Sequence, residues 1–320
     1  MPGEWAPHRR TWMCWPCRAE LWGDGLARAK AAYAAVARAI ARHEPVIMVA
    51  RPEDADEAAA ELPGIEVWTE PLDDSWARDI GPTFLKGPDG GAAVAWRFNA
   101  WGGKYARFDQ DAQFAVRAAE RDGTKTYRAP LVCEGGAMHS DGQGTLLTTE
   151  QCLLNPNRNP GMEKQTVTKI LRDFTGAQRV IWIGGTFSDT ETDGHIDNIA
   201  SFAAPGTVIV GVPDSRSHPD YAAVADAIRQ LKSEDLKVIE LVQPRTIRHD
   251  RQGRLLQTSY VNFYLCNGGL VMPSFDDPHD EAARALLADV FADRAISVIP
   301  AQGIVAGGGG IHCITQQEPA

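Results

Sequence analysis

The chain has 320 residues, of which 44% are hydrophobic and 23% are charged, and its formal net charge is −10. This composition is typical of a globular protein and excludes a disordered chain. Acidic residues outnumber basic ones by 42 to 32 without a basic run, which argues against nucleic acid as a partner and suits a small cationic substrate. No apolar stretch has the length of a membrane span, so we expect no membrane partner.

The N-terminus and the cysteines indicate the compartment. Residues 1–5 show no basic end followed by an apolar stretch, so we expect no secretory signal. The six cysteines are scattered through the chain, unlike a disulfide framework, which predicts reduced thiols and a cytoplasmic protein. Cys14 and Cys17 form a CxxC that precedes the first clear helix by several residues. We interpret this pair as structural, with a redox role as the alternative.

Apolar spacing predicts the elements in chain order. A stripe at three- and four-residue intervals predicts a helix over 24–43, with Asp24 as its candidate cap and Pro45 beyond its end. Further helices are predicted at 53–62, 108–121, 163–174, 221–231 and 281–291. Strands are predicted at 46–49, 65–68, 92–98, 145–149, 179–183, 208–212, 238–242, 259–265 and 296–300.

The alternation of helices and strands continues from end to end without a linker or a shift in composition. We therefore expect a mixed α/β fold in one domain, residues 1–320. The spacing is compatible with a degenerate strand–strand–helix–strand repeat, which periodicity alone does not prove.

Five segments interrupt the apolar pattern, at 73–79, 134–136, 193–198, 267–269 and 307–313. They combine glycines with carboxylates, histidines or a cysteine, which suggests backbone drawn close to a ligand. Each segment by itself is also typical of an ordinary turn.

Cys313 follows four glycines and a histidine at the end of the last of these segments. As a nucleophile it would need a cation or a base beside its thiol, and otherwise it is a small buried hydrophobe. Neighbours on a strand point to opposite faces, so its expected partner is His195 rather than the adjacent His312.

His195 lies two residues before Asp197, so on an extended segment the two side chains would share one face. That arrangement suits a proton-shuttling histidine beside a carboxylate that holds a cation, and a structural histidine is the alternative. A rival interpretation is a metal site with ligands from Glu134, His139, Asp141, His195 and Asp197. No HExxH or paired CxxC pattern supports that site.

Taken together, the sequence resembles the agmatine deiminase family, within the guanidino-group-modifying superfamily. The blocks that carry the resemblance, in the order of the family, are 1–8, 11–12, 15–16, 74–83, 98–105, 134–136, 148–158, 192–198, 259–263 and 308–317. Their order along nearly the whole chain is more specific than any single block. Cys14 and Ala137 depart from the usual residues of the family.

The resemblance implies a fold and a set of roles. The fold is a pseudo-fivefold α/β propeller, or pentein, of ββαβ-type modules around a central pocket. The implied roles are Cys313 as nucleophile, His195 as general acid and base, Asp79, Glu134 and Asp197 as guanidinium-binding carboxylates, and Trp76 as part of the substrate pocket.

The implied reaction is the hydrolysis of agmatine to N-carbamoylputrescine and ammonia, a step of polyamine biosynthesis, through a covalent amidino-cysteine. Such chemistry needs no metal or organic cofactor. Arginine or peptidyl arginine stays open as the substrate because the reaction centre would look the same. A metal-dependent amidohydrolase and a non-catalytic polyamine-binding protein are the alternatives from other classes. A homodimer or larger homo-oligomer is an expectation taken from the family.

Overall fold

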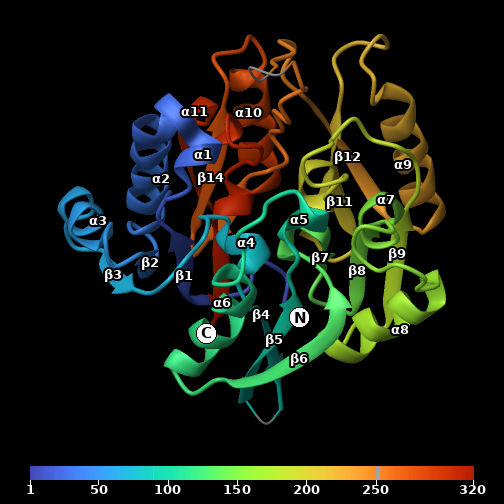
Figure 1. Ribbon diagram of the computed structural model, residues 1–320. Helices are drawn as coiled ribbons and strands as arrows, with labels where there is room; N and C mark the ends of the chain where they lie inside the picture. The colour runs from blue at the N-terminus through green and yellow to red at the C-terminus, as the bar shows by residue number, and fades with distance from the viewer. Residues whose placement is uncertain (89, 250–252) are drawn as a thin grey trace.

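The computed structural model describes residues 1–88, 90–249 and 253–320. In these ranges the strands form five sheets, one of four strands and four of three (Figure 1). The chain is mixed α/β, as predicted.

The four three-stranded sheets share one connectivity. The first two strands are antiparallel, a helix follows the second strand, and the third strand runs parallel to the second. The helix is needed because parallel neighbours cannot be joined by a tight turn. This is the strand–strand–helix–strand repeat with which the sequence spacing is compatible.

The units follow one another along the chain. The first contains β4 (Thr83–Gly87), β5 (Gly90–Arg97), α6 (Asp111–Arg121) and β6 (Lys125–Val132). The second contains β7 (His139–Ser140), β8 (Thr145–Thr149), α8 (Lys164–Thr175) and β9 (Arg179–Ile183). The third contains β10 (Ala200–Ala204), β11 (Thr207–Val212), α9 (Tyr221–Ser233) and β12 (Lys237–Val242). The fourth contains β13 (Tyr264–Cys266), β14 (Gly269–Ser274), α10 (Asp280–Val290) and β15 (Ala295–Pro300).

The four-stranded sheet joins the two ends of the chain. Its order is β16-β1-β2-β3, with β16 (Gln316–Pro319) antiparallel to β1 (His8–Cys14). The strands β2 (Val46–Ala50) and β3 (Glu66–Thr69) extend the sheet in parallel. The helix α2 (Leu26–Ile40) connects β1 to β2, and α3 (Ala55–Glu61) connects β2 to β3. The pairing of β1 with β16 brings the residues that follow Cys313 beside the N-terminal segment, and Figure 1 marks both chain ends in the same part of the molecule.

Four short helical turns carry most of the polar segments. They are α4 (Ala77–Ile80), η2 (Gly135–Ala137), η3 (Ile196–Asn198) and η4 (His312–Ile314). Further short turns are α1 (Ala19–Trp22), η1 (Gly23–Gly25), α5 (Ala100–Gly103), α7 (Glu150–Leu153) and α11 (Gln302–Val305). A single helical turn allows side chains close in sequence to point in different directions, so these turns can aim polar groups at one place.

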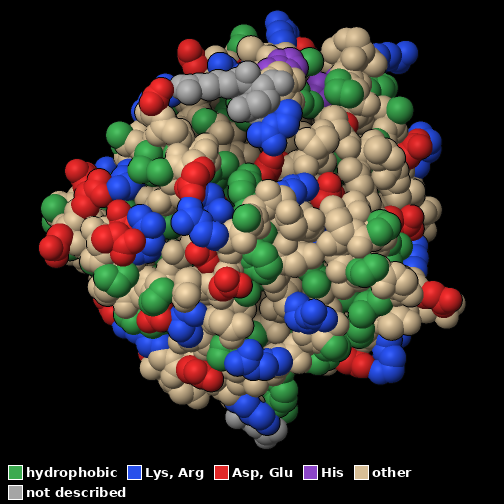
Figure 2. Space-filling model, in the orientation of Figure 1, with side chains coloured by type: hydrophobic (Ala, Val, Ile, Leu, Met, Phe, Trp, Pro, Cys, Tyr) green, Lys and Arg blue, Asp and Glu red, His purple; other side chains and the backbone are tan. Residues whose placement is uncertain are grey.

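The largest core cluster lies around the four-stranded sheet. Trp12, Trp15 and Tyr33 are almost completely buried there, and the predicted stripe of α2 faces the same cluster. Burial of such a side chain contributes about 1.5–3 kcal/mol, so this packing holds the N-terminal segment firmly. On the molecular surface, acidic and basic side chains are interspersed over the face shown in Figure 2.

Most of the predicted elements are confirmed. The six predicted helices appear as α2, α3, α6, α8, α9 and α10. However, α2 begins at Leu26 after Gly25 at its N-cap, so Asp24 lies in η1 and is not the cap. The strand predicted over 259–265 is wrong for most of its length. There the amide of Asn262 bonds the carbonyl of Ser259 in a turn, and the strand begins at Tyr264.

The structure also bears on the predictions for the cysteines and for membrane spans. Cys14 ends β1 and Cys17 precedes α1, and all six cysteines are buried and free. Among the described residues, no helix combines the length and apolar character that crossing a membrane requires.

Candidate active site

Four of the five predicted polar segments meet in one buried place. They correspond to α4, η2, η3 and η4, which contact one another although they are far apart in sequence. The fifth segment, 267–269, is the turn between β13 and β14, where Asn267 hydrogen-bonds the backbone of His8 instead.

Gly136 in η2 is the point on which the side chains converge. A Cβ there would lie 2.6 Å from His195 Nδ1, 2.9 Å from Asp197 Oδ2 and 2.9 Å from Asp79 Oδ1. Any larger residue would collide with three polar groups, so the site requires glycine here. The backbone N–H of Gly136 donates to Asp79 Oδ1 at 3.0 Å, which fixes that carboxylate.

The hydrogen-bond donors of Asp79 among the described residues are neutral. Besides Gly136, the indole N–H of Trp101 donates to its Oδ2 at 2.9 Å. Burial raises the pKa of Asp79 to about 6, and the neighbouring Asp197 and Glu134 add to the rise, while His195 and Trp101 oppose it. A bound cation would stabilise the ionised form of such a carboxylate.

Glu134 is held by a buried guanidinium. Arg158 Nε donates to its Oε1 at 2.7 Å, and neither side chain is exposed. Burial works against the charge, but Arg158 and His195 lower the pKa of Glu134 to about 2. Glu134 is therefore ionised in the folded protein.

His195 lies between these two carboxylates. Its Nδ1 is 3.8 Å from Asp79 Oδ1, and its Nε2 is 3.5 Å from Glu134 Oε2. Burial lowers the pKa of His195, but Asp79, Cys152 and Glu134 outweigh it and raise the pKa well above its ordinary value. The ring is fully buried, and neither nitrogen makes a hydrogen bond with the described residues. It is thus a cationic proton donor with unused hydrogen-bonding capacity.

Cys313 in η4 is buried against Asp197 and Asn262. Its sulfur lies 3.5 Å from Asp197 Oδ2, and Asn262 Nδ2 donates to the sulfur at 3.3 Å. Burial raises the pKa of the Cys313 thiol well above its ordinary value, and Asp197 and Asp79 add to the rise. Without a further cation, this thiol stays protonated.

Trp76 forms a wall beside the thiol. A Cβ on Gly309 would lie 2.5 Å from the Trp76 ring and 3.1 Å from Cys313 Cβ, so this glycine lets the ring approach the cysteine. The Trp76 ring also stacks on Trp22, with centroids 5.7 Å apart and planes at 24°. The stack fixes the position of the ring.

An open cleft borders the glycine-rich segment before Cys313. Gly307 and Gly308 line it, together with Trp22, Tyr105, Glu191 and Arg254. The next residue, Gly309, packs on Trp76. Glu191 accepts a hydrogen bond from the Tyr105 hydroxyl at 2.6 Å.

The structure brings the predicted site residues together, with two changes in local geometry. Asp197 lies in the 3-10 turn η3 that follows His195, so the expected extended segment is wrong. Cys313 also lies in a 3-10 turn, and its neighbour His312 points into the same polar network instead of the opposite face.

The five proposed metal ligands do not form one group. Among the described residues, the clusters compact enough for an ion contain Glu4, His139 and His312, and Glu134, Cys152 and His195. Asp141 instead accepts the backbone amides of Gln143 and Thr145 in a turn.

Sequence reasoning assigned no site role to several residues that contact the predicted site residues. They are Trp101, Cys152, Arg158, Asn262 and His312, and Glu4 contacts His312 in turn. All of these residues lie within blocks that carry the family resemblance, and that was the available signal. Their contacts join distant parts of the chain, so spacing does not reveal them.

Known proteins match this chain over nearly its whole length. Residues 1–319 match the Porphyromonas-type peptidyl-arginine deiminase family. The chain belongs to this family. A putative agmatine deiminase of Legionella pneumophila is 43% identical, with 100% of this chain and 95% of the relative covered. The agmatine deiminase of Stutzerimonas stutzeri is 42% identical with the same coverage.

A solved structure agrees in fold. The agmatine deiminase of Enterococcus faecalis superposes with a TM-score of 0.95 and 35% identity, over 100% of this chain and 95% of that one. The family resemblance predicted from the sequence is thereby confirmed. The similarity extends over the entire chain, so it includes all the segments that form the site.

Proposed function

We propose that this chain hydrolyses agmatine to N-carbamoylputrescine and ammonia, a step of polyamine biosynthesis, through a covalent intermediate on Cys313. The observation that carries the proposal is the meeting of three carboxylates, a buried histidine and a buried thiol around Gly136 and Gly309. Similarity to agmatine deiminases supports agmatine as the substrate.

The carboxylates account for binding. A guanidinium is planar and cationic, and its N–H groups suit forked bonds to carboxylates. We assign Asp79, Glu134 and Asp197 to this role, with Trp76 as a wall of the pocket. Bound substrate adds a further cation to the cluster, so it offsets the repulsion among the carboxylates.

The first half of the reaction forms the intermediate. The substrate cation favours loss of the Cys313 proton to water, and the thiolate attacks the guanidinium carbon. His195, cationic in the empty site, donates a proton to the departing nitrogen, which leaves as ammonia. The product of this step is an S-alkylthiouronium on Cys313.

The second half releases the product. His195, now neutral, takes a proton from water, and the hydroxide attacks the thiouronium carbon. The carbon–sulfur bond breaks, the Cys313 thiolate leaves, and transfer of the remaining proton to it gives the neutral ureido product and restores the thiol. All the groups in these steps are side chains of this protein and water.

The cleft accounts for the distal end of the substrate. Glu191 lines it beside Gly308, and we assign it to the primary ammonium of agmatine. Arg254 lies 3.2 Å from Glu191 in the same cleft, so Glu191 alone does not exclude the carboxylate of arginine. We expect Glu191→Gln to raise KM for agmatine, because the ammonium loses its carboxylate partner.

The fold and assembly belong to the same proposal. We propose that the five sheets surround the site as a pseudo-fivefold propeller in a single catalytic domain, residues 1–320. The repeated connectivity supports it, as does the β16–β1 pairing, which would close the ring. A cytoplasmic location and a homo-oligomer remain parts of the proposal.

The test is ammonia release from agmatine by purified, reduced and chelator-treated protein, with the ureido product measured in parallel. We expect turnover without added metal, and higher kcat/KM for agmatine than for arginine or a blocked arginine peptide. A preference for arginine or the peptide would overturn the substrate. Activity lost on chelation and restored by zinc would support a metal-dependent amidohydrolase instead.

A further inference from the structure

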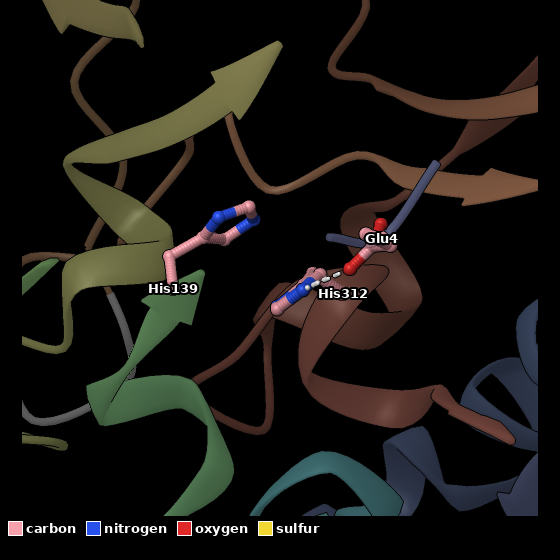
Figure 3. Close-up of side chains that lie close together, drawn as sticks. All are labelled: Glu4, His139 and His312. Carbon is pink, nitrogen blue, oxygen red and sulfur yellow. Dashed lines mark hydrogen bonds and ion pairs between the residues drawn. The ribbon is translucent and has the colours of Figure 1, made fainter. Parts of the chain in front are cut away.

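A buried histidine behind the site connects a carboxylate of the N-terminal segment to one from the middle of the chain. His312 Nδ1 lies 2.8 Å from Asp197 Oδ2, and its Nε2 lies 2.8 Å from Glu4 Oε2. Figure 3 shows the Glu4 carboxylate, from the N-terminal segment, directed at the His312 ring. All three side chains are buried, with at most 4% exposure.

The hydrogen bonds determine the charge of His312. Glu4 also accepts the backbone N–H of Leu265 at 2.8 Å and lies 3.4 Å from the Arg78 guanidinium, so it acts as an ionised acceptor. A neutral imidazole has one N–H, and two carboxylate partners require two. His312 is therefore an imidazolium.

His139 lies beside this pair but does not join it. Its Nδ1 accepts the backbone N–H of Phe202 at 3.3 Å, and its Nε2 contacts Ser201 Oγ at 3.1 Å. Burial lowers the pKa of His139 to about 4, which agrees with a neutral ring. Both histidines in Figure 3 use both of their nitrogens, so this group offers no free histidine ligand to a metal.

The two carboxylate oxygens of Asp197 differ in their hydrogen bonding. Its Oδ2 receives the His312 hydrogen bond, whereas its buried Oδ1 has no hydrogen-bond partner among the described residues. A buried oxygen without a partner is costly, and a ligand with N–H groups would satisfy it.

We propose that His312, held as an imidazolium between Glu4 and Asp197, is a positioning residue that keeps Asp197 ionised and leaves its Oδ1 free for the guanidinium. This inference rests on the proposed function, because the oriented carboxylate is one assigned to the substrate. Glu4 acts through His312 and touches no reacting atom.

The electrostatics of the surroundings agree with this geometry. The titratable and charged groups that face the His312 ring are Glu4, Arg78, His139 and Asp197. Burial and Arg78 lower the pKa of His312, but Glu4 and Asp197 outweigh them and raise it. Burial alone would raise the pKa of Asp197, and His312 is the principal group that lowers it instead.

The decisive variant is Glu4→Gln. Its amide oxygen can still accept from Leu265, while its NH₂ group faces His312 Nε2 and favours a bare nitrogen there. The hydrogen-bonded chain then survives with a neutral His312. The matched control is Glu44→Gln, because Glu44 is a buried carboxylate that pairs with His8 at 3.0 Å and lies outside the site.

The charge of His312 is measured by nitrogen NMR of histidine-labelled protein, with its signal assigned from His312→Asn. We expect an imidazolium with two N–H groups at pH 7 in the wild type and in Glu44→Gln. In Glu4→Gln the pKa of His312 should fall by about 1–3 units, the usual effect of removing a neighbouring opposite charge. A neutral His312 in the wild type at pH 7 would overturn the proposal.

The role is measured by the pH profile of kcat/KM for agmatine. In Glu4→Gln we expect the pKa of Asp197 to rise, because Asp197 loses its neighbouring cation. A second proton then joins the one on Asp79 in the acid limb, which should steepen from about tenfold toward about a hundredfold per pH unit. Glu44→Gln should keep the wild-type slope, even if its stability falls. A wild-type slope in Glu4→Gln, with His312 shown to be neutral, would overturn the positioning role. Failure of the wild type to deiminate agmatine would overturn the proposed function alone, because the NMR result needs no substrate.

Discussion

Two buried histidines, His8 and His195, each lie beside carboxylates, yet their surroundings differ. His8 contacts Glu44 through Nδ1 at 3.0 Å and the Glu4 carbonyl through Nε2 at 2.7 Å. Glu44 in turn accepts the backbone N–H of Asn267 at 2.7 Å. Around His195, neither ring nitrogen has a hydrogen-bond partner among the described residues.

The difference separates a structural cluster from a candidate reaction site. Buried polar groups in proteins are normally satisfied, and an unsatisfied group is retained where it has another use. The His8 cluster fastens the N-terminal segment to the sheet that carries β16. The His195 cluster keeps donors and acceptors in reserve for a substrate.

The largest expected effect on activity is that of replacing the Cys313 thiol, and replacement of the buried Cys152 thiol serves as the comparison. Cys152 lies 3.8 Å from Glu134 Oε2, whereas Cys313 contacts Asp197 and Asn262. We expect Cys313→Ser to lower kcat for ammonia release by roughly 10⁴-fold or more, as loss of a nucleophile does. Cys152→Ser should stay within about tenfold of the wild type, because the serine hydroxyl can replace a weak thiol donor. Equal losses in the two variants would refute the distinction.

The second prediction concerns the cation that holds Glu134. Arg158→Met would leave a buried carboxylate without its ion-pair partner, which typically costs about 3–5 kcal/mol of stability. Urea unfolding would measure this loss. Arg158→Lys should restore part of the stability, because it returns the charge but not the planar geometry. Unchanged stability in the methionine variant would show that Glu134 does not depend on Arg158.

The third prediction follows from Asp79, whose pKa burial raises to about 6. The guanidinium binds the ionised carboxylate, so a proton on Asp79 competes with substrate. Agmatine affinity of Cys313→Ala, measured by calorimetry, should be level above pH 6. Below it, affinity should fall about tenfold per pH unit, with proton release on binding. Constant affinity from pH 5 to 7 would contradict this assignment.

The smallest effect is expected at Trp101. Trp101→Phe removes the indole N–H that Asp79 Oδ2 accepts at 2.9 Å, while it keeps an aromatic ring against Phe98. A hydrogen bond of this kind is worth about 1 kcal/mol, so the pKa of Asp79 should rise by less than about one unit. The acid limb of agmatine binding would show the shift. A limb that moves to lower pH would contradict the contact.

Sequence periodicity predicted the longer helices better than the strands. Apolar runs and helical stripes lie in strands such as β8 and β9 and in helices such as α8, where side chains pack on one another. Seven strands were missed, and β13 was predicted to begin five residues too early. The missed strands are β1, β4, β6, β7, β10, β14 and β16. β7 has two residues, and β16 is polar apart from its last residue, so neither carries a period.

The same limit applies to the site. Asp79, Glu134, Asp197, His195 and Cys313 were found through blocks that resemble a family, and the structure brings them together. Glu4 and His312 are 308 residues apart in sequence, and only the closure of the first sheet by β16 joins their segments. Local spacing contains no information about such a contact.

The most direct test of the account is acid quenching of the reduced protein during turnover of agmatine, followed by peptide mass spectrometry. The account predicts an amidino adduct, agmatine less ammonia, on the peptide that contains Cys313. The adduct should be absent from Cys313→Ser. An adduct on Cys152 or another residue, or undiminished turnover by Cys313→Ser, would contradict the account.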